Sequence, residues 1–441
     1  MINLGKAIQG FWRSQQFKSA VKHGKTRLAE KILQDIEKSG TPLSWVEQLF
    51  KDKLKAEIYL DSRNSEIASL TQRLNEALTK NQDLAFKDEF DWFDNFAVNQ
   101  EFIDFIAKTF KFVEHDDYKL QVTGIDERIF DDFEADLTAF LKEELSRIPP
   151  EQLKVEMQKA VDDLNQLKHG KDPDYSFSLS PHVYLMKYFP EGVYCTYLAW
   201  FLIYQAGFLP TKFNVLDIAA GPATSIYGLA LFLRSSSGFF PLPAMHICYY
   251  SLEKQPPLQY RGLQFWRRYI ENQTLPTNAY FRFDTSDILT WDERNSKLPE
   301  KFFDFIVISH CFFSDPVTSV QANRTYQQIF NQSLSDRGYA LLIVQDKKIF
   351  KIYGFEQSEN IQQEQQVISK LLAELGLKLV WYKYLTSRDS RKPLSGSSFS
   401  KFAAENLPKQ PYMSPLLQQH FDLRFQSNYT LDDYVILAQK A

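Results

Sequence analysis

From residue 213 to residue 345, short runs of β-branched and aromatic residues alternate with segments of helical periodicity. The strand-like runs are FNVLDI (213–218), MHICYYSLE (245–253), AYFRFDTSDI (279–288), FFDFIVISH (302–310) and YALLIVQ (339–345). Strands that alternate with helices form right-handed βαβ units, which build a parallel sheet covered by helices on both faces. Two further strand-like runs follow, LKLVWYKYL (377–385) and DYVILAQ (433–439). The pattern predicts an α/β domain with a mostly parallel sheet.

The first 170 residues follow a different pattern. Apolar residues recur at three-and-four spacing, as in 46–60 and 65–80, while Gly and Pro are scarce. Gly, Pro, Asp and Ser then cluster at 168–181, which is typical of a break between domains. We therefore expect an all-helical N-terminal domain over 1–170 and an α/β domain over 171–441.

Charge is unevenly distributed along the chain. The net charge is −4, but residues 1–50 carry 8 Lys/Arg against 4 Asp/Glu, whereas residues 51–175 carry 17 against 29. A protein that binds nucleic acid over its whole surface would be more basic, although a local basic patch is compatible with these numbers. The negative charge of the helical segment instead favours a protein partner that is basic or neutral.

Three cysteines, Cys195, Cys248 and Cys311, lie far apart and lack metal-ligand spacing. We therefore expect no structural metal and a reducing compartment, the cytoplasm. The first residues, MINLGKAIQGFWRSQQ, lack the basic and apolar regions of a secretory signal.

One stretch, residues 192–211, has no charged side chain over twenty residues and approaches the length of a membrane span. It also contains Gln205, Gly207 and Pro210 and precedes a predicted strand directly. A buried helix in front of the first strand explains it better than a membrane span.

The segment after the first strand of the α/β domain has the composition of a ligand-binding turn. Asp217 ends the strand, and Ala219, Gly221 and Ala223 supply small side chains where backbone must approach a ligand. A helix that begins near Ser225 then offers free N–H groups, which could equally bind phosphates.

Acidic residues also follow the next two strands. Glu253 ends the second strand, where a carboxylate can accept both hydroxyls of a ribose, and Asp287 follows the third, where it could bond an adenine amino group. A solvated strand end beside Lys254 is the alternative for Glu253, and Asp284 is a competing candidate for the position of Asp287. The order of these residues, one after each of three successive strands, favours an adenosine-binding site.

Taken together, residues 180–441 resemble the class I S-adenosylmethionine-dependent methyltransferases. VLDIAAGPATS is similar to the first motif of that family, with Ala219 and Ala223 where glycine is usual; YYSLE, FDTSDIL and FDFIVISHCFFSD are similar to the second, third and fourth. The resemblance implies a Rossmann-like sheet with an antiparallel last strand and S-adenosylmethionine as cofactor. Its implied cofactor-binding residues are Asp217, Ala219, Gly221, Ala223, Glu253, Asp287 and Ser309.

A second resemblance is to methyltransferase-like proteins associated with the small ribosomal subunit. The GPAT turn, SHCFFSD and the preceding YLMKYFPEGVY segment are similar in placement. The clustered cysteines that hold an iron–sulfur cluster in that family have no counterpart in this sequence.

Two residues after the fourth strand are candidates for chemistry. His310 is the candidate catalytic base, although a hydrogen-bonded structural role is the alternative. Cys311 is expected to be a packing residue. The acidic and aromatic segment 88–112 is expected to be core, with a docking surface as the alternative, and the Ser-rich segment 387–401 is expected to form a loop near the substrate entrance.

The sequence thus predicts an S-adenosylmethionine-dependent methyltransferase whose acceptor, whether RNA, protein or small molecule, is unassigned. The alternative is a methyltransferase-like scaffold or assembly factor that keeps the fold without catalysis. A nicotinamide-dependent dehydrogenase would require a glycine triplet and a different C-terminal pair of strands.

Overall fold

The chain divides into two compact units, Met1–Trp92 and Phe93–Ala441. The computed structural model describes residues 17, 20, 26–38, 96–169, 173–239, 246–274, 277, 279–292, 298–391, 396–421 and 427–441. In the first unit the described helix is α2 (Thr26–Lys38). The helices expected at 46–60 and 65–80 lie outside the described residues, as does the start of the segment 88–112. The expected boundary at 170/171 lies within the second unit, in which apolar residues between Phe96 and Leu164 share a core with the sheet.

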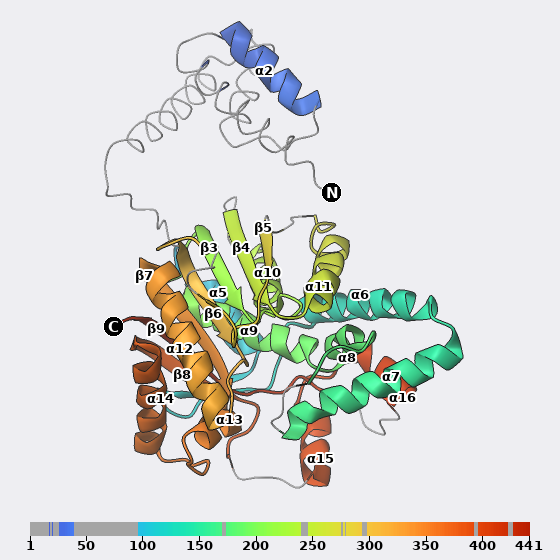
Figure 1. The fold of residues 1–441 in the computed structure, drawn as a ribbon, viewed down its shortest axis with the longest axis vertical. Helices are drawn as coiled ribbons and strands as arrows, with labels where there is room; N and C mark the ends of the chain where they lie inside the picture. Colours follow the sequence, from blue (N-terminus) through green and yellow to red (C-terminus); the bar gives the residue numbers. More distant parts are fainter. Residues whose placement is uncertain are drawn as a thin grey trace. The chain divides into compact units, whose positions relative to one another are not determined.

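One sheet organises the second unit (Figure 1). Its strands in the described part of the chain are β1 (Phe112–Glu114), β2 (Lys119–Val122), β3 (Lys212–Ile218), β4 (His246–Glu253), β5 (Ala279–Thr285), β6 (Phe303–Ser309), β7 (Leu334–Gln345), β8 (Leu377–Thr386) and β9 (Asp432–Lys440). They are ordered β1-β2-β8-β9-β7-β6-β3-β4-β5. The strands from β7 to β5 run parallel, and β9 lies antiparallel between β7 and β8. The predicted mostly parallel sheet with an antiparallel last strand is confirmed.

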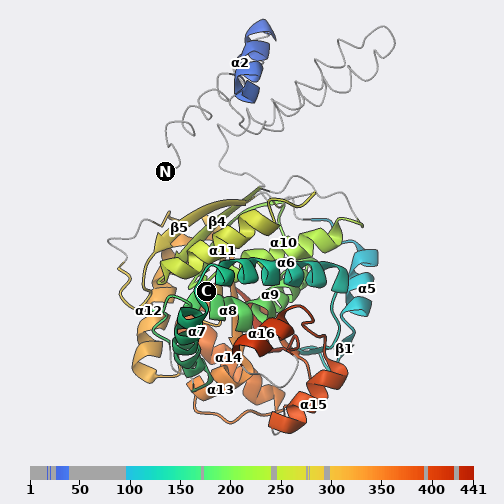
Figure 2. The same cartoon turned by 90° about the vertical axis from the view of Figure 1, so that its right-hand side faces the viewer.

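Helices cover both faces of this sheet. The helices of the second unit are α5 (Gln100–Thr109), α6 (Glu127–Ser146), α7 (Pro150–Leu164), α8 (Ser180–Lys187), α9 (Phe189–Gln205), α10 (Thr224–Ser236), α11 (Pro256–Tyr269), α12 (Pro316–Ser333), α13 (Asp346–Ile352), α14 (Ile361–Leu375), α15 (Gly396–Asn406) and α16 (Met413–Phe421). Apolar residues of α5, α6 and α8 to α11 form the core on one face, and those of α12 to α14 form the core on the other. Figure 2 shows α6, α10 and α11 together on the first of these faces.

Successive strand residues serve the two cores in turn. Val215 belongs to the core with α9 and α10, whereas its neighbour Leu216 belongs to the core with α12. Side chains alternate across a strand, and a strand buried on both faces therefore needs apolar residues at every position. This requirement accounts for the unbroken apolar runs in the sequence.

The uncharged stretch 192–211 forms most of α9. Fourteen of the seventeen residues of α9 are buried, and they pack against α10 and the sheet. Among the described residues, no helix has the length and apolar character that crossing a membrane requires.

Residues 112–122 form two strands where the sequence analysis expected only helix. Leu120 of β2 lies opposite Leu385 of β8, and β1 then pairs with β2. The side chain of Asp116 accepts hydrogen bonds from the backbone N–H groups of Tyr118 and Lys119, and these bonds close the turn between β1 and β2. The N-terminal region is therefore not all-helical, because a partner strand more than 260 residues later extends the sheet to include it.

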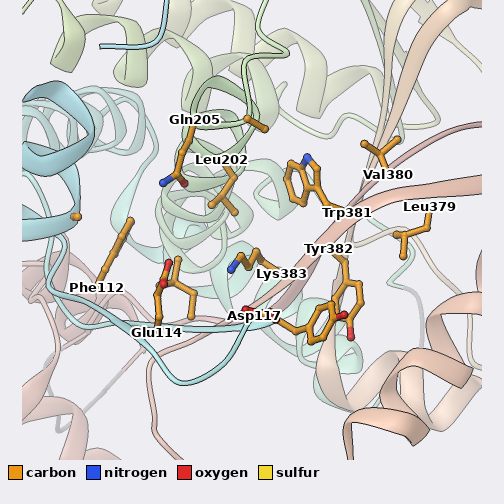
Figure 3. A pocket seen from close by; sticks show the side chains of 14 residues that line it. Phe112, Glu114, Asp117, Leu202, Gln205, Leu379, Val380, Trp381, Tyr382 and Lys383 are labelled. Carbon is orange, nitrogen blue, oxygen red and sulfur yellow. The ribbon is translucent and has the colours of Figure 1, made fainter. Parts of the chain in front are cut away.

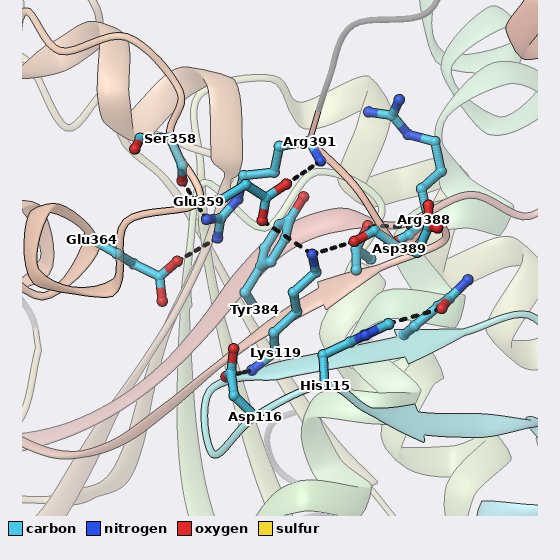
Figure 4. A network of polar contacts seen from close by, with 12 residues as sticks. His115, Asp116, Lys119, Ser358, Glu359, Glu364, Tyr384, Arg388, Asp389 and Arg391 are labelled. Carbon is cyan, nitrogen blue, oxygen red and sulfur yellow. Dashed lines mark hydrogen bonds and ion pairs between the residues drawn. The ribbon is translucent and has the colours of Figure 1, made fainter.

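A buried charged network fixes the chain just after β8 (Figure 4). Arg391 forms ion pairs with Asp346, at 3.2 Å, and with Glu364, and its guanidinium lies 4.2 Å from the ring centre of Tyr384. The exposed fractions of these three charged side chains are 5%, 0% and 5%. Nearby, Lys119 of β2 donates to the carbonyl oxygen of Asp389 at 2.5 Å. The start of the segment 387–401, expected to be a loop, is thus anchored, whereas its end forms α15.

Candidate functional site

The predicted site residues lie at the carboxyl edge of the parallel strands. The strand order reverses at β3, which has β4 on one side and β6 on the other. Ile218 at the end of β3 is paired with Ile308 near the end of β6. The chain then leaves β3 and β6 toward different helices, and such a reversal point forms the ligand crevice of doubly wound sheets.

The turn after β3 has an alternating backbone conformation. Ala219, Gly221 and Ala223 have φ angles of 54°, 55° and 68°. Only glycine adopts this left-handed region without strain, and an alanine there costs about 1–2 kcal/mol. Alternation of left-handed with ordinary residues turns backbone N–H groups toward one side, where they can bind a polar ligand. The two alanines thus keep the backbone conformation that glycine would provide.

Tyr184 lies over this turn. A methyl group added to Gly221 would find its nearest neighbours, all atoms of the Tyr184 side chain, at 3.8–3.9 Å, which is ordinary van der Waals contact. Below the turn the packing is tight, because a methyl group on Gly262 of α11 would lie 2.2 Å from the carbonyl oxygen of Pro222. The turn is therefore packed tightly against α11 and more loosely against Tyr184.

Glu253 crosses from the end of β4 to this turn. One of its carboxylate oxygens accepts a hydrogen bond from the N–H of Gly221 at 2.8 Å, and the other accepts one from Gln255, also at 2.8 Å. The residue is 7% exposed, and burial raises the pKa of its carboxyl above the ordinary value despite these N–H donors. Glu253 is therefore not a solvated strand end. Each oxygen retains a lone pair that can accept a further hydrogen bond.

Asp217 points into the protein. The same carboxylate oxygen accepts hydrogen bonds from the hydroxyls of Ser225 and Tyr249, both at 2.5 Å. Burial raises the pKa of Asp217 to about 6, against the effect of these two hydroxyls. The side chain ties the end of β3 to the first turn of α10 and to β4, so it orders the turn from beneath.

Asp287 lies two residues beyond the end of β5. One carboxylate oxygen accepts a hydrogen bond from the N–H of Leu289, and the other is 3.1 Å from the ammonium group of Lys254. The Asp287 side chain is 25% exposed. Because Lys254 follows Glu253 directly, this ion pair brings the ends of β4 and β5 together.

Ser309 ends β6 beside the end of β3, and His310 follows it. The hydroxyl of Ser309 is 2.9 Å from Nδ1 of His310, whose Nε2 is 2.9 Å from a carboxylate oxygen of Asp433. Asp433 lies near the start of β9, which brings it to the same edge of the sheet. Cys311 is partly buried against the core on the α12 side, as its apolar surroundings predicted.

Three residues of this region, Tyr184, Glu191 and Asp433, were not predicted from the sequence. Tyr184 of α8 lies over Gly221, and the pKa of its hydroxyl is raised by burial and then by the charge of Glu253. Glu191 of α9 lies close enough to His310 and Asp433 to interact with both charges. The uncharged stretch that predicted α9 gave one hint, since Glu191 is the last charged residue before it.

A separate pocket of about 740 Å³ lies along β8, and Figure 3 shows its lining. Phe112 and Glu114 of β1, Leu202 of α9 and Trp381 of β8 contribute to it. None of the predicted site residues lines this pocket. Among the described residues, no group of three or more His, Cys, Asp or Glu side chains could hold a metal ion.

No protein-family profile matches the chain, and a search of curated protein sequences finds no match. Solved structures do match, at low identity. A SAM-dependent methyltransferase from Methanosarcina mazei is 13% identical, with 53% of this chain and 95% of that chain covered and a TM-score of 0.31. Loganic acid methyltransferase with SAH is 10% identical (62% and 98% covered, TM-score 0.31), and a TehB-like methyltransferase from Corynebacterium glutamicum is 11% identical (65% and 99% covered, TM-score 0.27).

The strand order and direction decide the fold. Six parallel strands, β3 to β8, with the reversal at β3, and an antiparallel strand β9 inserted between the last two of them, give the sheet that the motifs predicted. The second unit has the class I methyltransferase fold. The turn after β3 lies in the segment that resembles the first motif, and β6 with the residues after it forms the segment that resembles the fourth. Both motifs lie at the carboxyl edge, on neighbouring strands.

Proposed function

We propose that the class I methyltransferase unit binds S-adenosylmethionine at the turn after β3 and transfers its methyl group to an acceptor. The observation that carries the proposal is the left-handed conformation of Ala219, Gly221 and Ala223 together with the carboxylate of Glu253 held against the turn. A turn built only for phosphate would not place a buried carboxylate beside its N–H groups, since two anions would repel.

The residues present fit this cofactor. Glu253 would accept the ribose hydroxyls through its remaining lone pairs, and Asp287 would accept the adenine amino group. Ala219, Gly221 and Ala223 would let the backbone approach the ligand, while Asp217 orders the turn and Ser309 contributes from β6. When bound, S-adenosylmethionine would supply a methyl group on a positively charged sulfur.

Calorimetric titration of the full chain with S-adenosylhomocysteine, NAD and ATP tests the proposal. We expect binding of the first ligand only. Glu253→Ala should weaken that binding about 10–150-fold, because a charge-assisted bidentate contact contributes about 1.5–3 kcal/mol. Glu101→Ala, in an exposed position on α5, is the matched control and should leave affinity unchanged. Equal binding by Glu253→Ala and the control would refute the ribose assignment.

The alternative function, a scaffold that keeps the fold without catalysis, predicts binding of the cofactor without transfer to any acceptor. We retain the proposal that the N-terminal region binds a protein partner, since residues 51–175 carry an excess of twelve negative charges. The three scattered cysteines support the cytoplasm as the compartment.

A further inference from the structure

A chain of polar contacts connects the end of β6 to β9 and α9. Ser309 contacts Nδ1 of His310, and Nε2 of His310 contacts Asp433, each at 2.9 Å. If Nε2 carries the proton and donates it to Asp433, then Nδ1 has a free lone pair and accepts from the Ser309 hydroxyl. Histidine in this tautomer is ready to take a proton at Nδ1.

The backbone of His310 is held in an uncommon conformation. Its φ is 61°, in the left-handed region, although histidine has a Cβ. Its N–H nevertheless donates to the carbonyl oxygen of Ile343 on β7 at 2.8 Å, which keeps the residue tied to the sheet. Strained residues of this kind persist where surrounding structure imposes them, and they concentrate at functional sites.

His310 also lies next to the cofactor turn. Ile218 and Ile308 are paired on neighbouring parallel strands, so Ala219 and Ser309 follow at the same level. Neighbouring strands lie about 4.8 Å apart. The imidazole is 35% exposed, so a ligand in the crevice can reach it.

Acidic groups surround the imidazole from two elements. Asp433 lies near the start of β9, and Glu191 lies on α9 together with Cys195, whose thiol contacts Asp433. Burial opposes the charged imidazolium, but Asp433 and Glu191 outweigh burial and raise the pKa of His310 above its ordinary value. Burial also raises the pKa of Glu191 to about 7, while Thr430 donates a hydrogen bond to its carboxylate at 3.0 Å.

We propose that His310 is the general base of the methyl transfer, with Asp433 and Glu191 as positioning residues, and that the acceptor is therefore an O–H or N–H group that loses a proton. This inference rests on the proposed function. A thioether or a tertiary amine acceptor has no proton to lose and would leave this arrangement without use.

The step balances with groups already named. The acceptor replaces the Ser309 hydroxyl at Nδ1, and its O–H or N–H bond breaks as Nδ1 takes the proton. The electron pair of that bond forms the new bond to the methyl carbon, and the carbon–sulfur bond breaks with its electrons remaining on sulfur. Asp433 holds the imidazolium through Nε2–H until the proton leaves to solvent. The base helps because a neutral acceptor would otherwise become a strong acid during transfer.

The test is a pH titration of the histidine ring carbons by NMR on the full chain, once with S-adenosylhomocysteine bound and once with sinefungin bound. Sinefungin carries an ammonium group where the methylated sulfonium would lie, whereas the sulfur of S-adenosylhomocysteine is neutral. A positive charge beside His310 disfavours the imidazolium, so its pKa should be lower with sinefungin by on the order of one pH unit. A histidine with a purely structural role away from the methyl group would show no difference.

Two controls accompany this measurement. His246 begins β4 at the opposite edge of the sheet, and its pKa should be the same with both ligands. In the free protein, Asp433→Asn should lower the pKa of His310, whereas Ser309→Ala, which removes a contact but no charge, should change it little.

Equal pKa values of His310 with both ligands bound would overturn the assignment of the base. Failure of either ligand to bind would instead overturn the proposed function, and the inference with it. Once an acceptor is in hand, His310→Gln should lower kcat about 100-fold or more with little change in KM, and should remove the rise of kcat with pH.

Discussion

Replacing Arg391 with methionine should destabilise the second unit by about 3–5 kcal/mol. The substitution keeps an apolar stem but leaves Asp346 and Glu364, which are 0% and 5% exposed, without a counterion. A buried carboxyl can escape this by taking a proton, which at pH 7 costs about 1.4 kcal/mol for each unit between 7 and its ordinary pKa near 4. Protonation of each carboxyl therefore costs at most about 4 kcal/mol. Relaxation of the structure around the two carboxyls reduces the summed cost to about 3–5 kcal/mol.

The stability loss caused by Arg391→Met should depend on pH in a direction set by the pKa of Asp346. Burial already raises the pKa of Asp346 above its ordinary value, against the effect of Arg391. Removing the arginine should raise that folded-state pKa further. A raised folded-state pKa contributes stability below the unfolded pKa that is lost as pH rises through the folded one. The loss caused by Arg391→Met should therefore be smaller at about pH 5 than at about pH 8.

Urea denaturation followed by near-ultraviolet circular dichroism measures the effect, with Arg147→Met as the matched control. Arg147 also pairs with two carboxylates, Glu143 and Glu144, but its side chain is 62% exposed, so its loss should cost less than about 1 kcal/mol. A triple variant that adds Asp346→Asn and Glu364→Gln should recover more than half of the stability. Equal losses for the two arginine variants, or a loss independent of pH, would refute the reasoning.

Three further predictions concern other parts of the second unit. Ala219→Gly and Ala223→Gly should each raise the free energy of unfolding by about 0.5–1 kcal/mol, because release of left-handed strain exceeds the entropy that glycine adds to the unfolded chain; no gain in urea denaturation would show that the strain is absent. Burial raises the pKa of Glu134 to about 7, so the stability that its protonated form contributes is present below pH 4.5 and lost as pH rises toward 7. Glu134→Gln should therefore reduce the difference in unfolding free energy between about pH 5 and about pH 8 by about 3 kcal/mol. An unchanged difference would contradict the raised pKa of Glu134. Gly262→Ala should cost about 1–3 kcal/mol and weaken cofactor binding, whereas Gly238→Ala, with nothing within 4 Å of the added methyl group, should do neither, as paired melting and titration experiments can show.

The strands of the α/β part could be predicted from sequence because their signal is local. The run 213–218 matches β3 to within one residue, and Glu253 ends β4 where the motif placed it. Burial on both faces requires apolar side chains throughout such strands, which makes their limits visible. The turn that is proposed to bind the cofactor could be located in the sequence because it adjoins the first of these strands.

The parts that sequence analysis missed depend on distant contacts. β2 has only four residues, of which Lys119 and Gln121 are polar, and it forms because β8 offers an edge to pair with. His310 meets Asp433 across 123 residues, and no spacing rule connects them. The Gly- and Pro-containing segment 168–181 lies within one compact unit, in which α6 packs on α10 and α11.

The location of β9 has a consequence for how the chain acquires its structure during synthesis. β9 is the last strand of the sheet in sequence, yet it lies between β7 and β8 and pairs with both. Until residues 432–440 leave the ribosome, the strands from β7 to β5 can assemble, but β8, β2 and β1 have no connection to them. The nascent chain would therefore expose two unpaired apolar edges, which are the surfaces that chaperones bind and along which chains aggregate. When β9 joins these two edges, it also brings Asp433 to His310, so the contact between the two side chains forms in the same late step that completes the sheet.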